Sequence, residues 1–183
     1  MAITRLGGAN AITGTIPTSV APGKGKVLQV VSTTKTDTFG VTATATKTAV
    51  TGLTVNITPS SSSNKIFVMV SLAVGNNESQ NSTRGRITRT VGGTETLLDE
   101  GASAGTRDTA SFDIYQNNGN HQEKVSMTFL DSPSSTAQCT YGVKINASGS
   151  SGDILVNRAR TDASDGLDRV RTSSTITVME VSA

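Results

Sequence analysis

The sequence of 183 residues has few side chains that carry catalytic or stacking chemistry: no Trp, two Tyr, four Phe, one Cys and one His. Cys139 cannot form an internal disulfide, and its place in the stretch "AQCTYGVKI" predicts a small buried side chain. His121 lies in a polar turn, and adjacent acids such as Asp99 and Glu100 would point to opposite faces of an extended chain. We therefore predict that the protein is not an enzyme and needs no cofactor.

Long apolar runs are also missing. No segment approaches the roughly 18 consecutive apolar residues of a membrane span, and the first 14 residues lack the apolar stretch of a signal peptide. These features predict a soluble protein made in a cytoplasm, with no membrane partner. Asp162, Asp165 and Asp168 are spaced by three, but they lack the ligand spacing of a calcium loop. A solvated turn is favoured there, and no metal site is predicted.

The apolar content is low for a folded domain. Leu, Ile, Val and Phe total 40 residues, or roughly 22% of the chain, and the net charge is only +2. A chain of this kind folds around a thin core, and burial against identical copies commonly supplements such a core. Self-association is therefore the first functional expectation.

The chain pattern indicates an all-β protein. Ser and Thr total 51 residues, and apolar residues alternate with polar ones in short runs separated by turn residues. In residues 65–74, Ile66 and Val68 would share one face while Phe67 and Met69 form the other, so we expect a central strand buried on both faces. The runs cover residues 53–58, 65–74, 84–91, 94–99, 110–116, 124–131, 138–146, 153–157 and 174–181. About ten strands at this spacing predict a two-sheet jelly-roll sandwich, with the last strand inside a sheet.

Two groups of charged residues are candidates for a binding surface. They comprise Arg84, Arg86, Arg158, Arg160, Asp162, Asp165 and Asp168. Arginine clusters can bind nucleic acid, but stacking aromatics are scarce and the aspartates are interleaved with the arginines. Contacts between subunits or with a receptor therefore explain the groups better than nucleic-acid binding.

Residues 1–25 differ from the rest of the chain. The segment "ANAITGTIPTSVAPG" is uncharged, contains Pro17 and Pro22, and spaces Ile12, Ile16 and Val20 by four. Extended segments of this type can add to the edge of a neighbouring sheet. We expect an attachment arm at residues 1–25 and a jelly-roll head at residues 26–183; a disordered tail is the alternative.

Three longer stretches resemble a known group of proteins. "GLTVNITPSSSSNKIFVMVSL", "VSMTFLDSPSSTAQCTYGVKI" and "SSTITVMEV" are similar to segments of bacteriophage virion proteins, especially tail-fibre and head-fibre proteins of marine and cyanobacterial phages. The resemblance covers residues 26–183 and implies a homotrimer with a jelly-roll head like that of tumour necrosis factor, carried on a virion. The chain lacks the long shaft of a fibre, so a short spike, a knob or a capsid decoration protein fits better.

Two functions remain open at this point. The first is a structural virion protein that binds other capsid or tail proteins through its arm. The second is a receptor-binding tail-fibre head that recognises a host surface glycan, although an aromatic platform for sugars is scarce in this chain.

Overall fold

The computed structural model describes residues 25–77, 81–116, 120–147, 152–160, 162 and 170–183. These residues form eleven β-strands and no helix. The strands are β1 (Val27–Lys35), β2 (Phe39–Thr42), β3 (Thr48–Ile57), β4 (Lys65–Asn76), β5 (Asn81–Val91), β6 (Thr94–Leu98), β7 (Phe112–Gln116), β8 (Gln122–Asp131), β9 (Cys139–Ala147), β10 (Asp153–Val156) and β11 (Ser174–Val181). The predicted runs coincide with strands β3 to β11; the short strand β2 was not predicted.

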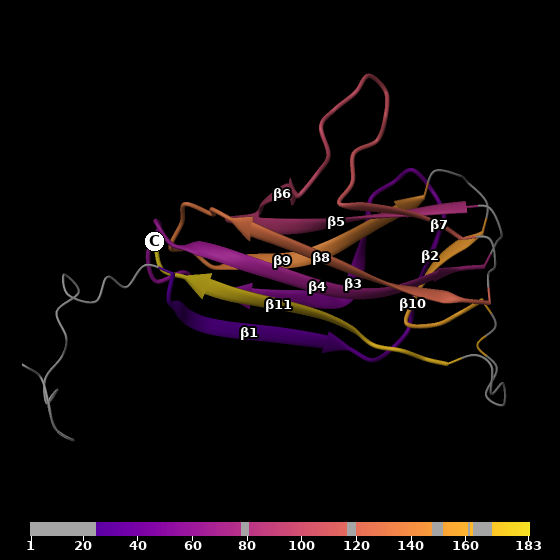
Figure 1. The fold of residues 1–183 in the computed structure, drawn as a ribbon, viewed down its shortest axis with the longest axis horizontal. Helices are drawn as coiled ribbons and strands as arrows, with labels where there is room; N and C mark the ends of the chain where they lie inside the picture. The colour runs from indigo at the N-terminus through magenta and orange to yellow at the C-terminus, as the bar shows by residue number, and fades with distance from the viewer. Residues whose placement is uncertain (1–24, 78–80, 117–119, 148–151, 161, 163–169) are drawn as a thin grey trace, which may run out of the picture.

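The strands form two antiparallel sheets that run along the long axis of the molecule (Figure 1). In sheet A, one edge of β4 pairs with β8, and the other edge pairs first with β11 and then with β10; β1 and β2 lie outside these two strands. Sheet B has the order β3, β9, β5, and the far edge of β5 pairs with β6 and β7 in turn. The chain crosses repeatedly from one antiparallel sheet to the other, as in a jelly-roll sandwich, and the predicted all-β fold is confirmed.

The core lies between the sheets and takes alternate residues from each strand. Leu53, Val55 and Ile57 of β3 are 0 to 3% exposed, as their shared face predicts. The predicted position of the last strand is also confirmed, because β11 pairs with β1 on one side and β4 on the other.

One prediction about β4 is wrong. Ile66 and Val68 face the core, but Phe67 lies on the outer face of sheet A and is only partly buried, while Met69 is 40% exposed. The strand is central within its sheet, yet nothing in the described chain covers the outer face. Apolar residues on both faces of β4 therefore predicted a second covering layer, and the described residues do not supply it.

A polar junction fills the place where β11 and β10 meet along β4. Ala73 of β4 donates its main-chain N–H to Ser174 Oγ (2.9 Å), and its carbonyl accepts from the Asn157 N–H (3.1 Å). Asn157, at a φ of 63°, also donates its side-chain amide to the carbonyls of Lys35 and Asp37, at 2.9 Å each. These bonds satisfy backbone groups that a continuous strand would otherwise pair.

Two buried carboxylates occupy one cross-strand row of sheet A, on either side of Ile66. Asp131 accepts bonds from Arg89 (2.7 and 2.9 Å) and from the Tyr141 hydroxyl (2.6 Å), both of which lie in sheet B. Burial, followed by this hydrogen bond, raises the pKa of Tyr141. The contacts of Asp131 therefore tie the two sheets together at this end of the sandwich.

Glu180 is the second of these carboxylates and is 1% exposed. Its oxygens accept bonds from Gln29 (2.6 Å), from Asn64 (2.6 Å) and from both the main-chain N–H and the hydroxyl of Ser60 (2.7 Å each). Burial acts to raise the pKa of Glu180, but the donors outweigh it and lower the pKa from 4.5 to about 2. The Pro-Ser turn before β4 is thus held to the C-terminal strand by hydrogen bonds to one carboxylate.

We predict that Glu180→Gln destabilises the fold and removes one acid-sensitive step. A carboxyl whose pKa is depressed on folding contributes stability that is complete above pH 4.5 and is lost as the pH falls through about 2. Urea unfolding at pH 7 and pH 3 should show a smaller loss between the two pH values for Glu180→Gln than for the wild type. The control is Glu95→Gln on the surface of sheet B, and an equal acid sensitivity of wild type and Glu180→Gln would contradict this role.

Candidate interaction surfaces

The outer face of sheet A is uncharged over three complete cross-strand rows. Each row takes one residue from β1, β11, β4 and β8, in that order. The rows are Val30, Met179, Phe67 and Leu130; then Ser32, Thr177, Met69 and Thr128; then Thr34, Thr175, Ser71 and Ser126. We call these twelve residues the neutral face. A four-strand surface without a charge is unusual, because solvent-facing strands normally carry charged residues.

The first row of the neutral face is wholly apolar. Val30 is 55% exposed and Leu130 is 49% exposed, and Met69 in the next row is 40% exposed. Val27 and Leu28, which are also exposed, extend this region at the start of β1. Large apolar side chains gathered in one place on a sheet mark an interaction surface more often than isolated ones do.

The remaining rows of the neutral face carry hydroxyls, several of which bond within the sheet. The hydroxyl oxygens of Ser32 and Thr177 lie 2.9 Å apart, and those of Thr34 and Thr175 lie 3.3 Å apart. Paired hydroxyls lose less when a partner excludes water from them. A shallow hollow of about 280 Å³ lies between Met69 and the short side chains of these rows. The neutral face therefore combines low desolvation cost with a shape that a partner could fill.

Strand β8 forms an open edge beside the neutral face. It pairs with β4 in unbroken register, and no other described strand pairs with it. A regular edge of this length invites pairing or packing with another chain. Lys65 and Lys124 stand at the two ends of the neutral face, and each binds an oxygen of its own chain, Ser132 Oγ at 3.0 Å and the Ser173 carbonyl at 3.2 Å.

The outer face of sheet B has the opposite character. Arg84 and Arg86 share this face, as their alternation in sequence predicts. Arg86 is nonetheless fully buried, because the loop of residues 99–111 folds over it. Figure 1 shows this loop projecting from the sandwich between β6 and β7. Arg86 donates to Glu100 (2.9 Å) and to the carbonyl of Thr109, which lie at the two ends of the loop.

Further contacts close the base of the 99–111 loop. Arg86 pairs with Asp108 at 2.7 Å and donates to Asn146 Oδ1 at 2.6 Å. Burial acts against ionisation of Asp108, but hydrogen bonds from Asn146 and Arg86 hold its pKa well below the usual range. Gly85 leaves room for Phe112, the first residue after the loop, because a Cβ at this position would clash with the Phe112 ring. Arg86 is thus paired with Glu100 and Asp108 within the chain.

We predict that Arg86→Met opens the base of the 99–111 loop and lowers the free energy of unfolding by about 2 to 4 kcal/mol, because it leaves carboxylates without their buried partner. Amide exchange should accelerate at Ser111, whose N–H bonds the Gly85 carbonyl at 2.9 Å. The matched control is Lys144→Met, which breaks a surface pair with Glu95 and should cost less than about 1 kcal/mol. Unchanged exchange at Ser111 in Arg86→Met would disprove the clamp.

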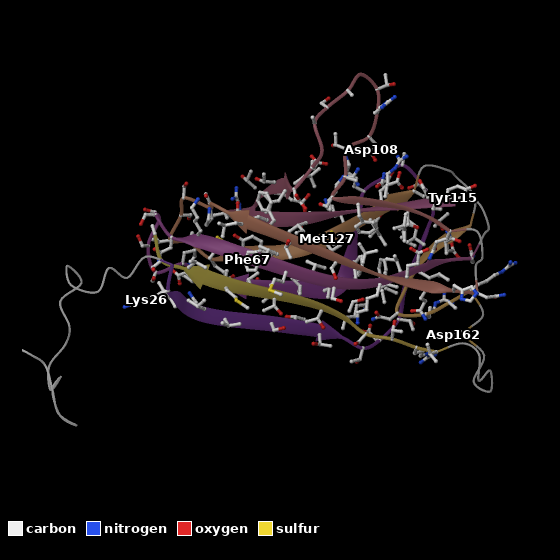
Figure 2. All side chains as sticks on the ribbon, in the orientation of Figure 1. Lys26, Phe67, Asp108, Tyr115, Met127 and Asp162 are labelled. Atoms are coloured by element: carbon white, nitrogen blue, oxygen red, sulfur yellow. The ribbon has the colours of Figure 1, made fainter. Side chains whose placement is uncertain are left out.

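Asp162, one of the predicted aspartates, lies at the end of the sandwich opposite Lys26 (Figure 2). Asp162 binds Arg171 of its own chain at 2.8 and 2.9 Å, and these bonds lower the pKa of Asp162. Arg158 is partly buried and Arg160 is exposed. The structure does not bring either of them to Arg84 and Arg86. Other predicted residues lie outside the described part of the chain: Ile12, Ile16, Pro17, Val20, Pro22, Asp165 and Asp168.

The described residues hold no group of three or more His, Cys, Asp or Glu side chains placed to bind a metal ion. No helix in this part of the chain is long and apolar enough to cross a membrane. His121 is exposed just before β8, and Cys139 is buried.

The neutral face was not found by sequence reasoning, although a signal for it was present. β11 alternates Thr and Met with buried Ile and Val, and β4 places Phe67 and Met69 opposite its core residues. Only the strand order shows that these residues meet those of β1 and β8 in continuous rows, because none of these four strands are neighbours in sequence.

Comparison with known proteins gives matches to solved structures only. The sequence matches no protein family and no curated protein. The structure matches a chain of the T13 viral particle of infectious bursal disease virus at 10% identity and a TM-score of 0.44, over 87% of this chain and 36% of that chain. The structure of the Gx strain of the same virus matches at 12% identity and a TM-score of 0.39, over 86% of this chain and 39% of that chain. The VP2 subviral particle matches at the same identity and TM-score, over 85% of this chain and 38% of that chain. The chain thus spans well under half of these viral chains, and TM-scores below 0.5 establish no shared function.

Proposed function

We propose that this protein is a non-enzymatic structural protein of a bacteriophage virion, a short spike or capsid decoration protein, that forms a homotrimer through its neutral face. The observation that carries this proposal is the uncharged outer face of sheet A, with its exposed Val30 and Leu130. The virion location and the number three come from the resemblance of residues 26–183 to trimeric phage proteins.

A second copy of the chain is the best occupant of the neutral face for three reasons. The face has no charge within its rows, so two copies can approach it without electrostatic repulsion. It lies beside the open edge of β8, so one copy can cover both features of the next. The thin core leaves Phe67 and Met69 outside the sandwich, and burial between copies supplies the second layer that these side chains lack.

We expect light scattering of the purified protein to give about three times the chain mass of 18.8 kDa. Thr177→Lys should dissociate the trimer, because the ammonium group would be buried without a partner at a cost of several kcal/mol. The matched control is Thr54→Lys, which places the same charge on exposed β3 of sheet B and should remain trimeric. A trimeric Thr177→Lys variant would move the interface elsewhere, and a monomeric wild type would refute self-association.

The arm is the proposed anchor to other virion proteins. Deletion of residues 1–24 should leave the head folded and trimeric, since β1 begins at Val27, but it should remove binding to particles. Three extended arms per trimer would act together through effective concentration. The measurement is co-sedimentation of full-length and truncated protein with particles that lack the native copy. A full-length protein carrying Ile16→Asp should lose only part of its recovery, whereas equal recovery after deletion would place attachment on the head.

The alternative function, a receptor-binding head, is favoured by one observation. Tyr115 is 56% exposed and, like Asp162, lies at the end of the sandwich away from Lys26, where the described chain begins its first strand (Figure 2). An exposed aromatic ring suits contacts with a polar receptor, and Arg158 and Arg160 remain the predicted basic residues of such a surface. Loss of host adsorption by particles carrying Tyr115→Ala, with normal assembly, would support this function over a purely structural one.

A further inference from the structure

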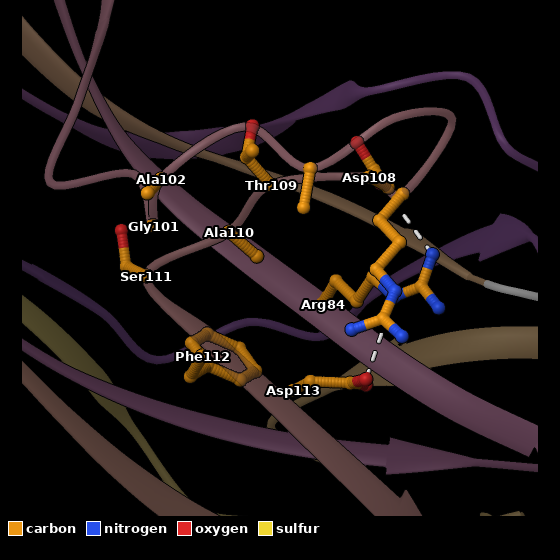
Figure 3. A pocket seen from close by; sticks show the side chains of 11 residues that line it. Arg84, Gly101, Ala102, Asp108, Thr109, Ala110, Ser111, Phe112 and Asp113 are labelled. Carbon is orange, nitrogen blue, oxygen red and sulfur yellow. Dashed lines mark ion pairs between the residues drawn. The ribbon is translucent and has the colours of Figure 1, made fainter.

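A hollow of about 540 Å³ lies between the 99–111 loop and the adjoining strands β5 and β7. Its volume falls within the range of small-ligand sites, about 300 to 1,000 Å³. Figure 3 shows Arg84 and Asp113 on one side of the hollow and the loop residues Ala102, Asp108 and Ala110 along the other. We propose that this hollow is a binding site for a neutral saccharide.

The position of Arg84 is the first argument for a ligand. Its guanidinium lies between Asp108 and Asp113 at 3.5 Å from each carboxylate. Charge-assisted bonds of arginine are usually about 2.7 to 2.9 Å long. Asp108 itself is held at shorter distances by Arg86 and Asn146, at 2.7 and 2.8 Å. Asp108 is thus fixed by other residues, and Asp113 is partly exposed. Arg84 makes only long contacts with both carboxylates and retains N–H donors for another partner.

The balance of donors and acceptors selects the class of ligand. The lining carries two guanidinium groups, Arg84 and Arg107, and two carboxylates, Asp108 and Asp113, so its charges cancel. A net anion would meet the carboxylates and a net cation the guanidinium groups, each at an electrostatic cost. Neighbouring hydroxyls of a sugar can accept from a guanidinium and donate to a carboxylate at the same time. A neutral polyhydroxyl ligand uses both kinds of group.

The walls of the hollow are held in place before a ligand binds. Arg86 clamps the base of the loop, and Ser111 donates its hydroxyl to the Leu98 carbonyl at 3.5 Å and its N–H to Gly85. Ala102, Ala104 and Ala110 keep the walls short and give the weakly apolar surface that sugar C–H groups can contact. A site that is already formed saves the ordering cost of binding.

The site is independent of the proposed trimer. It lies on the outer face of sheet B, whereas the neutral face belongs to sheet A, so the two proposals rest on different residues. A monomeric Thr177→Lys variant should bind the same ligand as the wild type. Failure of the saccharide site and failure of self-association are therefore separate results.

The test is a titration followed by NMR of protein labelled at the alanine methyl groups. The probes are maltotriose, mannotriose, lactose and tri-N-acetylglucosamine, each to about 20 mM, so that dissociation constants in the millimolar range are detected. At least one neutral saccharide should shift the methyl signals of Ala102, Ala104 and Ala110 and leave those of the buried Ala43 and Ala147 unchanged. Absence of any shift at the loop alanines with all four probes would overturn the proposal.

Two variants assign the binding to the hollow. Asp113→Asn removes a carboxylate that is 52% exposed and should weaken saccharide binding about tenfold, the effect of losing one charged hydrogen bond. Glu95→Gln, on the same face but outside the hollow, should bind as the wild type does. Equal affinity of the wild type and Asp113→Asn, or stronger binding of anionic trigalacturonate than of any neutral probe, would contradict the proposed site.

Discussion

The structure depends on one geometric constraint: a β-strand presents its side chains to two faces, and a two-layer sandwich buries only one face of each sheet. The chain meets this constraint differently on its two sides. Sheet B covers its outer charges with its own 99–111 loop, which pairs Arg86 with Asp108 and Glu100. The described chain has no corresponding cover for sheet A, where Phe67 and Met69 stay on the surface. This difference is the reason that we assign self-association to sheet A.

Buried polar side chains complete the fold where apolar side chains are few. Asp131 joins the sheets through Arg89 and Tyr141, and Glu180 joins the last strand to the turn before β4. Each oxygen of these carboxylates accepts hydrogen bonds from specific donors, and these bonds stabilise the buried negative charges. Networks of this kind impose one register on the strands, because a shift of one residue would turn the carboxylates to the opposite face. These hydrogen bonds therefore specify the strand register in a protein whose apolar core is thin.

The three sequence stretches that resemble phage virion proteins contain these polar partners. Ser60 and Asn64 belong to the Pro-Ser turn, Asp131 to the "LDSP" turn and Glu180 to the final strand. These residues close one end of the sandwich. The two proposed surfaces, the neutral face and the hollow under the loop, lie on opposite sheets and leave room for both assembly and ligand binding.

Period-two alternation is a local property that each strand carries alone. For this reason the sequence predicts the all-β class, nine of the strands, the central position of β4 and the common face of Arg84 and Arg86. It also indicated, through Phe67 and Met69, that β4 needed a second apolar layer, but it assigned that layer to the same chain. The tertiary structure decided the rest. Val30, Met179, Phe67 and Leu130 form one row only through pairing between strands distant in sequence, and Arg86 is buried only because a loop of its own chain folds over it. Strand order and loop paths depend on contacts between distant residues, and no local pattern in the chain encodes them.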